Sequence, residues 1–337
     1  MTTFLRLLAE PDKAQALLET CTHLRQGTSD PRHFEVAPSS FDAVPGKPFA
    51  YWVSEAVREV FRRLPGFEGE GRTVKQGLAT ADDFRFVRAW WEVSGQGWFS
   101  FAKGGSFSPF YADVTLVLNW HSNGREMKAW ADPLYGNSGW SRIIKSTQYY
   151  LRPGLTWPRR TNGLSFRVMP AGCIFADKGP AAFVTNDDPD DLLALSCLLN
   201  SRAFGLLVSV QLARTELAQS YEVGLIQQTP IPPLTPGQHQ HLASLARRAW
   251  SLKRTLDTVT ETSHAFLLPA ALRPRLGDYD PPAIEVELAR IQAEIDTMAF
   301  DLYGFAEADR RPLTPTPLPE GEGLFRLPSP PREKGWG

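Results

Sequence analysis

The residues from Leu155 to Ala181 combine basic, aromatic and glycine residues in a pattern that suits contact with a polyanion. The stretch holds three arginines, one lysine, one tryptophan and three glycines, and its single acidic residue is Asp177. Basic side chains neutralise phosphate groups, and glycine lets a backbone come close to a ligand. The chemistry that this composition indicates is the binding of nucleic acid.

The basic character extends over a longer segment. Residues 101–180 contain ten Lys/Arg and four Asp/Glu, a net charge of +6 in a chain whose formal net charge is -1. The aromatic residues interleaved with these charges are Trp120, Trp130, Trp140, Tyr149, Tyr150 and Trp157. Such a mixture is typical of nucleic-acid-binding surfaces. The alternative is a solvated face on a β-rich domain that needs aromatic residues for its core.

Motifs for catalysis are missing from the sequence. There is no phosphate-binding G-x-x-x-x-G-K-[ST], no G-x-S-x-G, no H-E-x-x-H and no glycine-rich turn of the Rossmann type. The run Asp280-Pro281-Pro282-Ala283 is close to the D-P-P-aromatic loop with which amino-methyltransferases hold an extruded base, but Ala283 stands where the ring belongs. We interpret this run as a helix start with prolines in its first turn.

Cysteine and histidine spacing indicates neither disulfides nor a metal site. Cys21, Cys173 and Cys197 are far apart in the sequence, and His239 and His241 point to different faces of one predicted helix. The N-terminus lacks the uninterrupted apolar core of a signal peptide, and no apolar stretch approaches the roughly 20 residues of a membrane span. We therefore expect a cytoplasmic protein without a membrane partner.

The apolar periodicity changes twice along the chain. It is helical at 8–26 and 51–64. Residues 84–176 are predicted to be mostly strand, with extended segments at 84–93, 98–102, 114–120, 164–169 and 173–176. Helices are predicted again from 192, from 238 to 260 and from 283 to 303, where Gly304 gives a stop signal.

These elements predict an α+β fold with four parts. A chain of 337 residues with 42% hydrophobic residues can bury a sizeable core. We expect a helical N-terminal segment at 1–80, a mixed β-rich module at 81–235, C-terminal spacer helices at 236–310, and a disordered Pro/Gly-rich tail at 311–337.

Several long sequence blocks resemble one family of enzymes. They include "GEGRTVKQGLATADDFRFVRAWWEV", "WFSFAKGGSFSPFYADVTLVLNW" and "YYLRPGLTWPRRTNGLSFRVMPAGCIFADKGPA", and they lie within residues 41–271. This region resembles the carboxy-terminal half of adenine-specific DNA methyltransferases of the type IIG restriction-modification and BREX phage-defence (PglX-like) kind. The part that is resembled is the target-recognition region.

The resemblance implies a DNA-recognition role without the chemical step. In the family, the amino-terminal catalytic part carries a glycine motif that binds S-adenosylmethionine (AdoMet) and an N-P-P-[YF] catalytic loop. Neither motif occurs in this sequence. The chain would then carry no cofactor and act on double-stranded DNA with a catalytic methyltransferase half or other defence-system subunits as partners. A complete methyltransferase fits poorly, because no segment supplies the glycine-rich turn. A protein-interaction scaffold or a decayed gene fragment stays as the alternative.

The resemblance also implies which residues contact DNA. They lie in the "FAKGG" loop, in "LTWPRRTNG" and in "ADKG": Lys103, Gly104, Gly105, Thr156, Arg159, Arg160, Asn162 and Lys178. The two glycines have a second interpretation as a hairpin turn. We assign Trp90, Trp91 and Trp157 to core packing.

Overall fold

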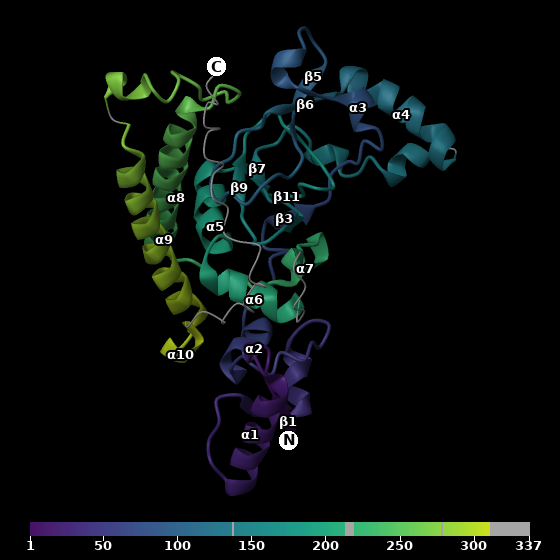
Figure 1. Ribbon diagram of the computed structural model, residues 1–337. Coiled ribbons are helices and arrows are strands. Elements are labelled where there is room, and N and C mark those ends of the chain that lie inside the picture. Colours follow the sequence, from purple (N-terminus) through teal and green to yellow (C-terminus); the bar gives the residue numbers. More distant parts are fainter. Residues whose placement is uncertain (137, 213–218, 278, 311–337) are drawn as a thin grey trace, which may run out of the picture.

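The structure is a computed structural model that describes residues 1–136, 138–212, 219–277 and 279–310. Its mixed α+β architecture confirms the predicted fold class. The tail predicted to be disordered lies outside the described residues. A column of helices stands beside the β-sheets, and the N-terminal elements extend from one end of the molecule (Figure 1).

The N-terminal part combines two strands with two helices. Strand β1 (Thr2–Leu5) is antiparallel to β2 (His33–Val36), and helix α1 (Lys13–Gln26) lies between them in the sequence. Helix α2 (Glu55–Arg63) leads towards the rest of the molecule (Figure 1). Both predicted helices are confirmed with shorter bounds, whereas the sequence pattern does not predict the two strands.

The first of two four-stranded sheets has the order β3-β11-β7-β9, with every neighbouring pair antiparallel. Its strands are β3 (Arg72–Lys75), β7 (Gly154–Thr156), β9 (Arg167–Met169) and β11 (Ala181–Val184). Thr156 lies opposite Arg167 on one side and Ala181 on the other. The register therefore places the start of the "LTWPRRTNG" segment inside the sheet.

The second sheet has the order β10-β5-β6-β4, in which β10 is parallel to β5. Its strands are β4 (Val87–Ala89), β5 (Trp98–Ala102), β6 (Leu116–Asn119) and β10 (Ile174–Phe175). The strand predicted at 84–93 is wrong except for β4, because helix α3 (Asp83–Phe86) precedes it. The Asp82 side chain caps α3 by accepting the Arg85 N–H at 3.0 Å.

The prediction that residues 84–176 are mostly strand is also wrong, because helix α4 (His121–Tyr135) lies within them. With α3 it forms an arm that projects away from the helical column (Figure 1). The helix begins with three left-handed residues, Ser122, Asn123 and Gly124. A Cβ atom on Gly124 would lie 2.4 Å from the Trp120 ring, so this turn requires glycine.

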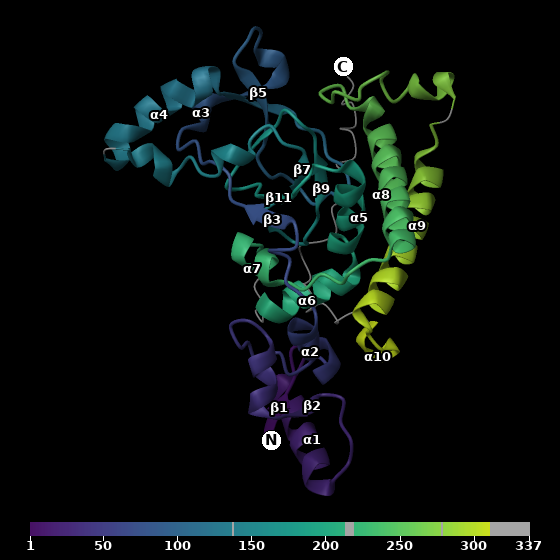
Figure 2. The same cartoon turned by 180° about the vertical axis from the view of Figure 1, so that it is seen from behind.

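The helical column follows the sheets. Its helices are α5 (Pro189–Leu199), α6 (Arg202–Leu212), α7 (Val223–Gln228), α8 (Pro236–Leu256), α9 (Pro281–Tyr303) and α10 (Glu307–Arg310). Helix α8 lies between α5 and α9 and packs on both (Figure 2). Two short strands, β8 (Arg160–Thr161) and β12 (Gln219–Ser220), pair antiparallel.

Several short 3-10 helices complete the chain: η1 (Pro38–Ala43), η2 (Trp90–Glu92), η3 (Gly139–Arg142), η4 (Thr147–Tyr149), η5 (Asp257–Val259) and η6 (Arg273–Leu276). The main helix ends agree with the local signals in the sequence. Thr235 and Gln238 form a capping box at the start of α8, and Gly304 ends α9 in the left-handed conformation with φ 72°. Asp280 caps α9, which confirms that the Asp280-Pro281-Pro282-Ala283 run is a helix start.

Two hydrophobic cores hold the fold. The first core joins buried residues of α2, the first sheet and the helices α5 to α9, and it includes the fully buried Trp157. The second core joins buried residues of the second sheet, α3 and α4, such as Phe86, Leu118 and Met127, with residues of β9 and β11. The first core contains residues on both sides of positions 80 and 235, and the predicted domain boundaries stay predictions.

Within the part of the chain that the structure describes, no single helix is long and apolar enough to cross a membrane. Helices α5 and α6 pass that test only when they are taken together, and they are bent by 62° relative to one another. Their apolar side chains are buried in the first core.

Candidate nucleic-acid interface

Three loops that carry predicted contact residues touch one another. They comprise residues 103–105 after β5, residues 159–162 around β8, and residues 177–179 before β11. The Arg159 N–H donates to the Lys178 carbonyl oxygen at 2.9 Å. A Cβ atom on Gly179 would lie 2.5 Å from the Gly104 nitrogen, so the first and third loops are in backbone contact. We name these three segments the basic loop cluster.

The two glycines of the first loop are required by close packing. Gly104 and Gly105 have φ values of 97° and 116°, a region that side-chain-bearing residues rarely adopt. A Cβ atom on Gly104 would also lie 2.7 Å from the Lys178 carbonyl oxygen. The β5–β6 connection extends over residues 103–115, so these glycines are not a tight hairpin turn.

Two basic side chains of the cluster are held by carboxylates. Lys103 forms an ion pair with Asp83, whose pKa stays below its ordinary value because the bonds from Lys103 and Thr80 outweigh the effect of burial. The Arg159 Nε lies 3.2 Å from a Glu222 oxygen, and its Nη1 lies 3.8 Å from Asp177. The Arg159 side chain is only 18% exposed. The Arg159 side chain therefore lies mostly buried between two carboxylates.

Among the other outward residues, Arg160 and Asn162 are open to solvent, whereas Lys178 also has a carboxylate partner. Arg160 and Asn162 are exposed, and no ion pair of Arg160 occurs within the described residues. The Lys178 side chain is 54% exposed and lies 3.6 Å from Asp177. Arg160, Asn162 and Lys178 thus present donors on the same loops that hold Arg159.

Thr156 differs from the rest of the predicted set. Its side chain is buried, and its hydroxyl donates to the Pro180 carbonyl oxygen at 2.9 Å. The register of β7 between β9 and β11 causes this burial. Thr156 therefore lies beneath the basic loop cluster and supports it, instead of facing outwards with the arginines.

Two basic residues near the cluster were not among the contact residues predicted from the sequence. Arg167 is 5% exposed, and its guanidinium donates to the carbonyl oxygens of Gly104 and Ser106. Burial lowers its pKa to about 10. Lys253, on α8, donates to the Ser108 hydroxyl at 3.2 Å. The position of Arg167 in an otherwise apolar strand could have identified it from the sequence. No local pattern relates Lys253 to a loop about 150 residues earlier.

The aromatic residues are only partly in the core. Trp157 is fully buried, which confirms its assignment, and its Nε1 donates to the Tyr221 carbonyl oxygen at 2.9 Å. The assignment of Trp91 is wrong, because this side chain is 52% exposed on η2. Trp90 is half-buried and donates to the Thr262 carbonyl oxygen. Phe107, which is 56% exposed, lies over Gly163 beside Asn162.

The described ranges bring no three His, Cys, Asp or Glu side chains together as a metal-binding group. His239 instead contacts Asp191, and His241 contacts Glu294, both at 2.8 Å.

Comparison with curated proteins places the chain near adenine-specific methyltransferases. It is 24% identical over 307 residues to the adenine-specific methyltransferase PglX of Lacticaseibacillus casei (strain Zhang), covering 81% of this chain and 24% of PglX. It is 27% identical over 240 residues to the adenine-specific methyltransferase BrxX of Escherichia coli O9:H4 (strain HS), covering 68% of this chain and 18% of BrxX. These matches confirm the predicted resemblance to adenine-specific methyltransferases, and the assignment to their target-recognition half stays a prediction. The chain spans about a quarter of PglX and less than a fifth of BrxX.

No protein-family model matches the chain. Among solved structures, the type IIL restriction-modification enzyme MmeI in complex with DNA is similar over 72% of this chain and 34% of MmeI, with a TM-score of 0.47 and 13% identity.

Proposed function

We propose that this chain is the DNA target-recognition portion of an N6-adenine-specific DNA methyltransferase of a restriction-modification or BREX phage-defence system. It binds double-stranded DNA in the cytoplasm through the basic loop cluster. Methyl transfer is carried out by a catalytic methyltransferase partner that holds AdoMet, and the chain is inactive alone.

The observation that carries this function is the convergence of the three loops. Residues 103–105, 159–162 and 177–179, which are separate in the sequence, form one surface with Arg159, Arg160, Asn162 and Lys178. Loops that present arginine, lysine and amide side chains from a β-scaffold can contact both phosphates and base edges. The similarity to two adenine-specific methyltransferases supports DNA as the polyanion.

Within this surface we infer different roles for the two adjacent arginines. Arg160 has no carboxylate partner in the described ranges and suits a phosphate, which needs charge but little geometry. Arg159 is oriented by Glu222 and Asp177, and a guanidinium held in one orientation suits the paired acceptors of a guanine edge.

The test is an electrophoretic shift of the purified chain on random duplexes and on duplexes that contain the cognate site, which is the site that the partnered enzyme methylates. Binding is measured at about 50 mM and about 200 mM salt, with and without the catalytic partner. We expect salt-sensitive binding to random duplexes and a tighter complex on the cognate site. Calorimetry with AdoMet should show no binding to the chain alone, because the glycine-rich turn is absent from its sequence.

Two results would overturn this function. A folded chain that binds no duplex at either salt concentration would favour the protein-interaction scaffold instead. Binding of AdoMet at micromolar affinity would require a pocket in this chain that belongs to catalysis.

A further inference from the structure

Two cations from distant parts of the chain hold the segment that follows the Lys103-Gly104-Gly105 loop. Arg167 donates to the carbonyl oxygens of Gly104 and Ser106, the second at 3.2 Å. The Lys253 ammonium donates to the Ser108 hydroxyl at 3.2 Å. These bonds use two of the five N–H donors of a guanidinium and one of the three of an ammonium, so donors remain on both groups.

Neither cation has a carboxylate partner among residues 1–136, 138–212, 219–277 and 279–310. Two carboxylates line the hollows beside these cations, and each accepts hydrogen bonds from other residues. Asp113 accepts hydrogen bonds from the backbone N–H and the ring of His264, both at 3.0 Å. Asp257 accepts from the hydroxyls of Tyr111 and Ser263. A buried cation usually has a paired anion, because leaving its charge uncompensated is costly.

Both cations line hollows that adjoin one another. Arg167 lines a cavity of about 310 Å³ together with Lys103, Gly104 and Gly105. Lys253 lines a neighbouring cavity of about 320 Å³. Both cavities share the lining residues Ser106, Ala112, Asp113 and Thr115. Space for a small anion therefore lies between the basic loop cluster and α8.

The two charges also act on each other. Burial and then the charge of Arg167 lower the pKa of Lys253. Like charges repel in a partly buried site, and an anion bound near both groups would reduce this repulsion.

We propose that Arg167 and Lys253 form a phosphate-binding site behind the basic loop cluster, and that a phosphate group of the DNA backbone occupies it. The source of the phosphate rests on the proposed function, because the Arg167 cavity opens among Lys103, Gly104 and Gly105 of that cluster. The free donors of Arg167 and Lys253 are the groups that would contact the phosphate oxygens, because the Ser108 hydroxyl already donates to the Tyr111 carbonyl oxygen at 2.6 Å.

The first experiment uses inorganic phosphate as the probe. The melting temperature of the full chain is measured in sodium phosphate and in sodium chloride at equal ionic strength, for the wild type, Lys253→Met and Arg247→Met. Arg247 is the control, since it is an exposed cation on the same helix and pairs with Asp190. Phosphate stabilises folded proteins non-specifically as well, so the informative quantity is the part of the rise that Lys253→Met loses.

We expect the wild type and Arg247→Met to gain more from phosphate than Lys253→Met does. An equal gain from phosphate in all three proteins would show that Lys253 is only a structural clamp and would overturn the site.

The second experiment identifies the source of the phosphate. Binding to random duplexes is measured against salt, and Lys253→Met should flatten the slope of log affinity against log salt by about 0.9, the value for one phosphate contact. A specific gain from inorganic phosphate with an unchanged DNA slope would assign the site to free phosphate and overturn the DNA source.

These outcomes separate the site from the proposed function. If the wild type binds DNA and Lys253→Met binds it with the same slope, the function stands and the DNA-backbone site fails. If the wild type binds no DNA but keeps the specific gain from phosphate, the anion site stands and the DNA-recognition function fails.

Discussion

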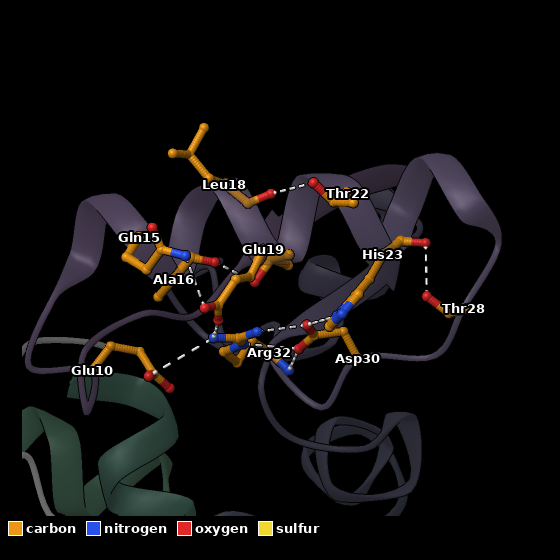
Figure 3. Close-up of polar contacts among 11 residues, drawn as sticks. Glu10, Gln15, Ala16, Leu18, Glu19, Thr22, His23, Thr28, Asp30 and Arg32 are labelled. Atoms are coloured by element: carbon orange, nitrogen blue, oxygen red, sulfur yellow. Dashed lines mark hydrogen bonds and ion pairs between the residues drawn. The ribbon is translucent and has the colours of Figure 1, made fainter.

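The N-terminal part and the basic loop cluster differ in the balance of cations and carboxylates. Around Asp30 a single arginine is surrounded by carboxylates: Arg32 donates to both Asp30 oxygens, at 3.0 and 2.8 Å, and lies 3.8 Å from Glu10 and 3.5 Å from Glu19 (Figure 3). His23 contacts the same Asp30 carboxylate at 2.8 Å. We name Glu10, Glu19, His23, Asp30 and Arg32 the Asp30 cluster.

The basic loop cluster and the groups behind it have more cations than nearby carboxylates. Arg160 is open, and Arg167 and Lys253 have no carboxylate partner within the ranges described. This difference separates cations that stabilise the fold from cations that are available to a ligand. Arginine surrounded by acids holds a chain reversal between α1 and β2, whereas unmatched cations on loops can take up phosphates.

The largest expected effect is on the support of the basic loop cluster. Trp157→Ala should lower the free energy of unfolding by about 3–5 kcal/mol, because it removes a large, fully buried side chain from the first core. It also removes the bond from Nε1 to the Tyr221 carbonyl oxygen, next to the contact between Tyr221 N–H and the Arg159 carbonyl oxygen. Urea denaturation measures the loss.

Trp91→Ala is the matched control for this substitution. Because Trp91 is 52% exposed, its removal should change stability by no more than about 0.5 kcal/mol. Similar losses for the two tryptophans would contradict the assignment of Trp157 to the core beneath the loops.

The next effect sharpens the contrast between matched and unmatched arginines within the basic loop cluster. Arg160→Ala should weaken binding to all duplexes and flatten the slope of log affinity against log salt by about 0.9. Arg159→Ala should cost about 1–3 kcal/mol on the cognate site and little on random duplexes, because a fixed guanidinium contacts a base. Affinity titrations on both kinds of duplex at several salt concentrations test this difference.

Arg32→Ala provides the comparison from the other region. It should leave every DNA affinity unchanged while lowering the melting temperature, since its partners are acids of its own chain. If Arg159→Ala and Arg160→Ala behave like Arg32→Ala, both arginines are structural and the two regions do not differ.

The smallest effect concerns acid pH. Hydrogen bonds from the Arg32 side chain and backbone hold the pKa of Asp30 far below its ordinary value. A carboxyl with a depressed pKa in the folded state stabilises that state above its unfolded pKa of about 3.9, and the contribution is lost as pH falls below that value. Asp30→Asn should therefore be less stable than the wild type at neutral pH, and the gap should narrow below about pH 4.

Melting temperatures of Asp30→Asn, Asp42→Asn and the wild type between about pH 3 and pH 7 check this expectation. Asp42 is an exposed carboxylate of the same region that pairs with Lys47 at 3.0 Å, and its replacement should change the curve little. Parallel curves for Asp30→Asn and the wild type would exclude a special role of the Asp30 carboxylate.

Local sequence signals were sufficient for the helix ends and for much of the candidate surface. The cap residues Thr235, Asp280 and Gly304 act on backbone groups within four residues, so their effect can be predicted without knowing the fold. The same holds for Gly104 and Gly105, where residue type alone indicates an unusual backbone. The contact role of the predicted DNA-binding residues stays a prediction.

Tertiary structure decided which of the chemically suitable residues face outwards. Thr156 and Arg160 are four positions apart, yet the register between β9 and β11 buries the first and leaves the second exposed. Helix α4 was hidden from the pattern because aromatic residues such as Trp130 suit both a strand and a helix that packs on the second core.

The sequence by itself determined the α+β class, the capped helices and a basic segment, since each depends on composition or on neighbours a few residues away. Only the fold could bring Lys253 next to Ser108, or set Arg159 between Asp177 and Glu222, because these contacts join segments separated by many residues. Charge along a chain can be counted from the sequence. Whether a given charge is matched depends on the distances that folding creates.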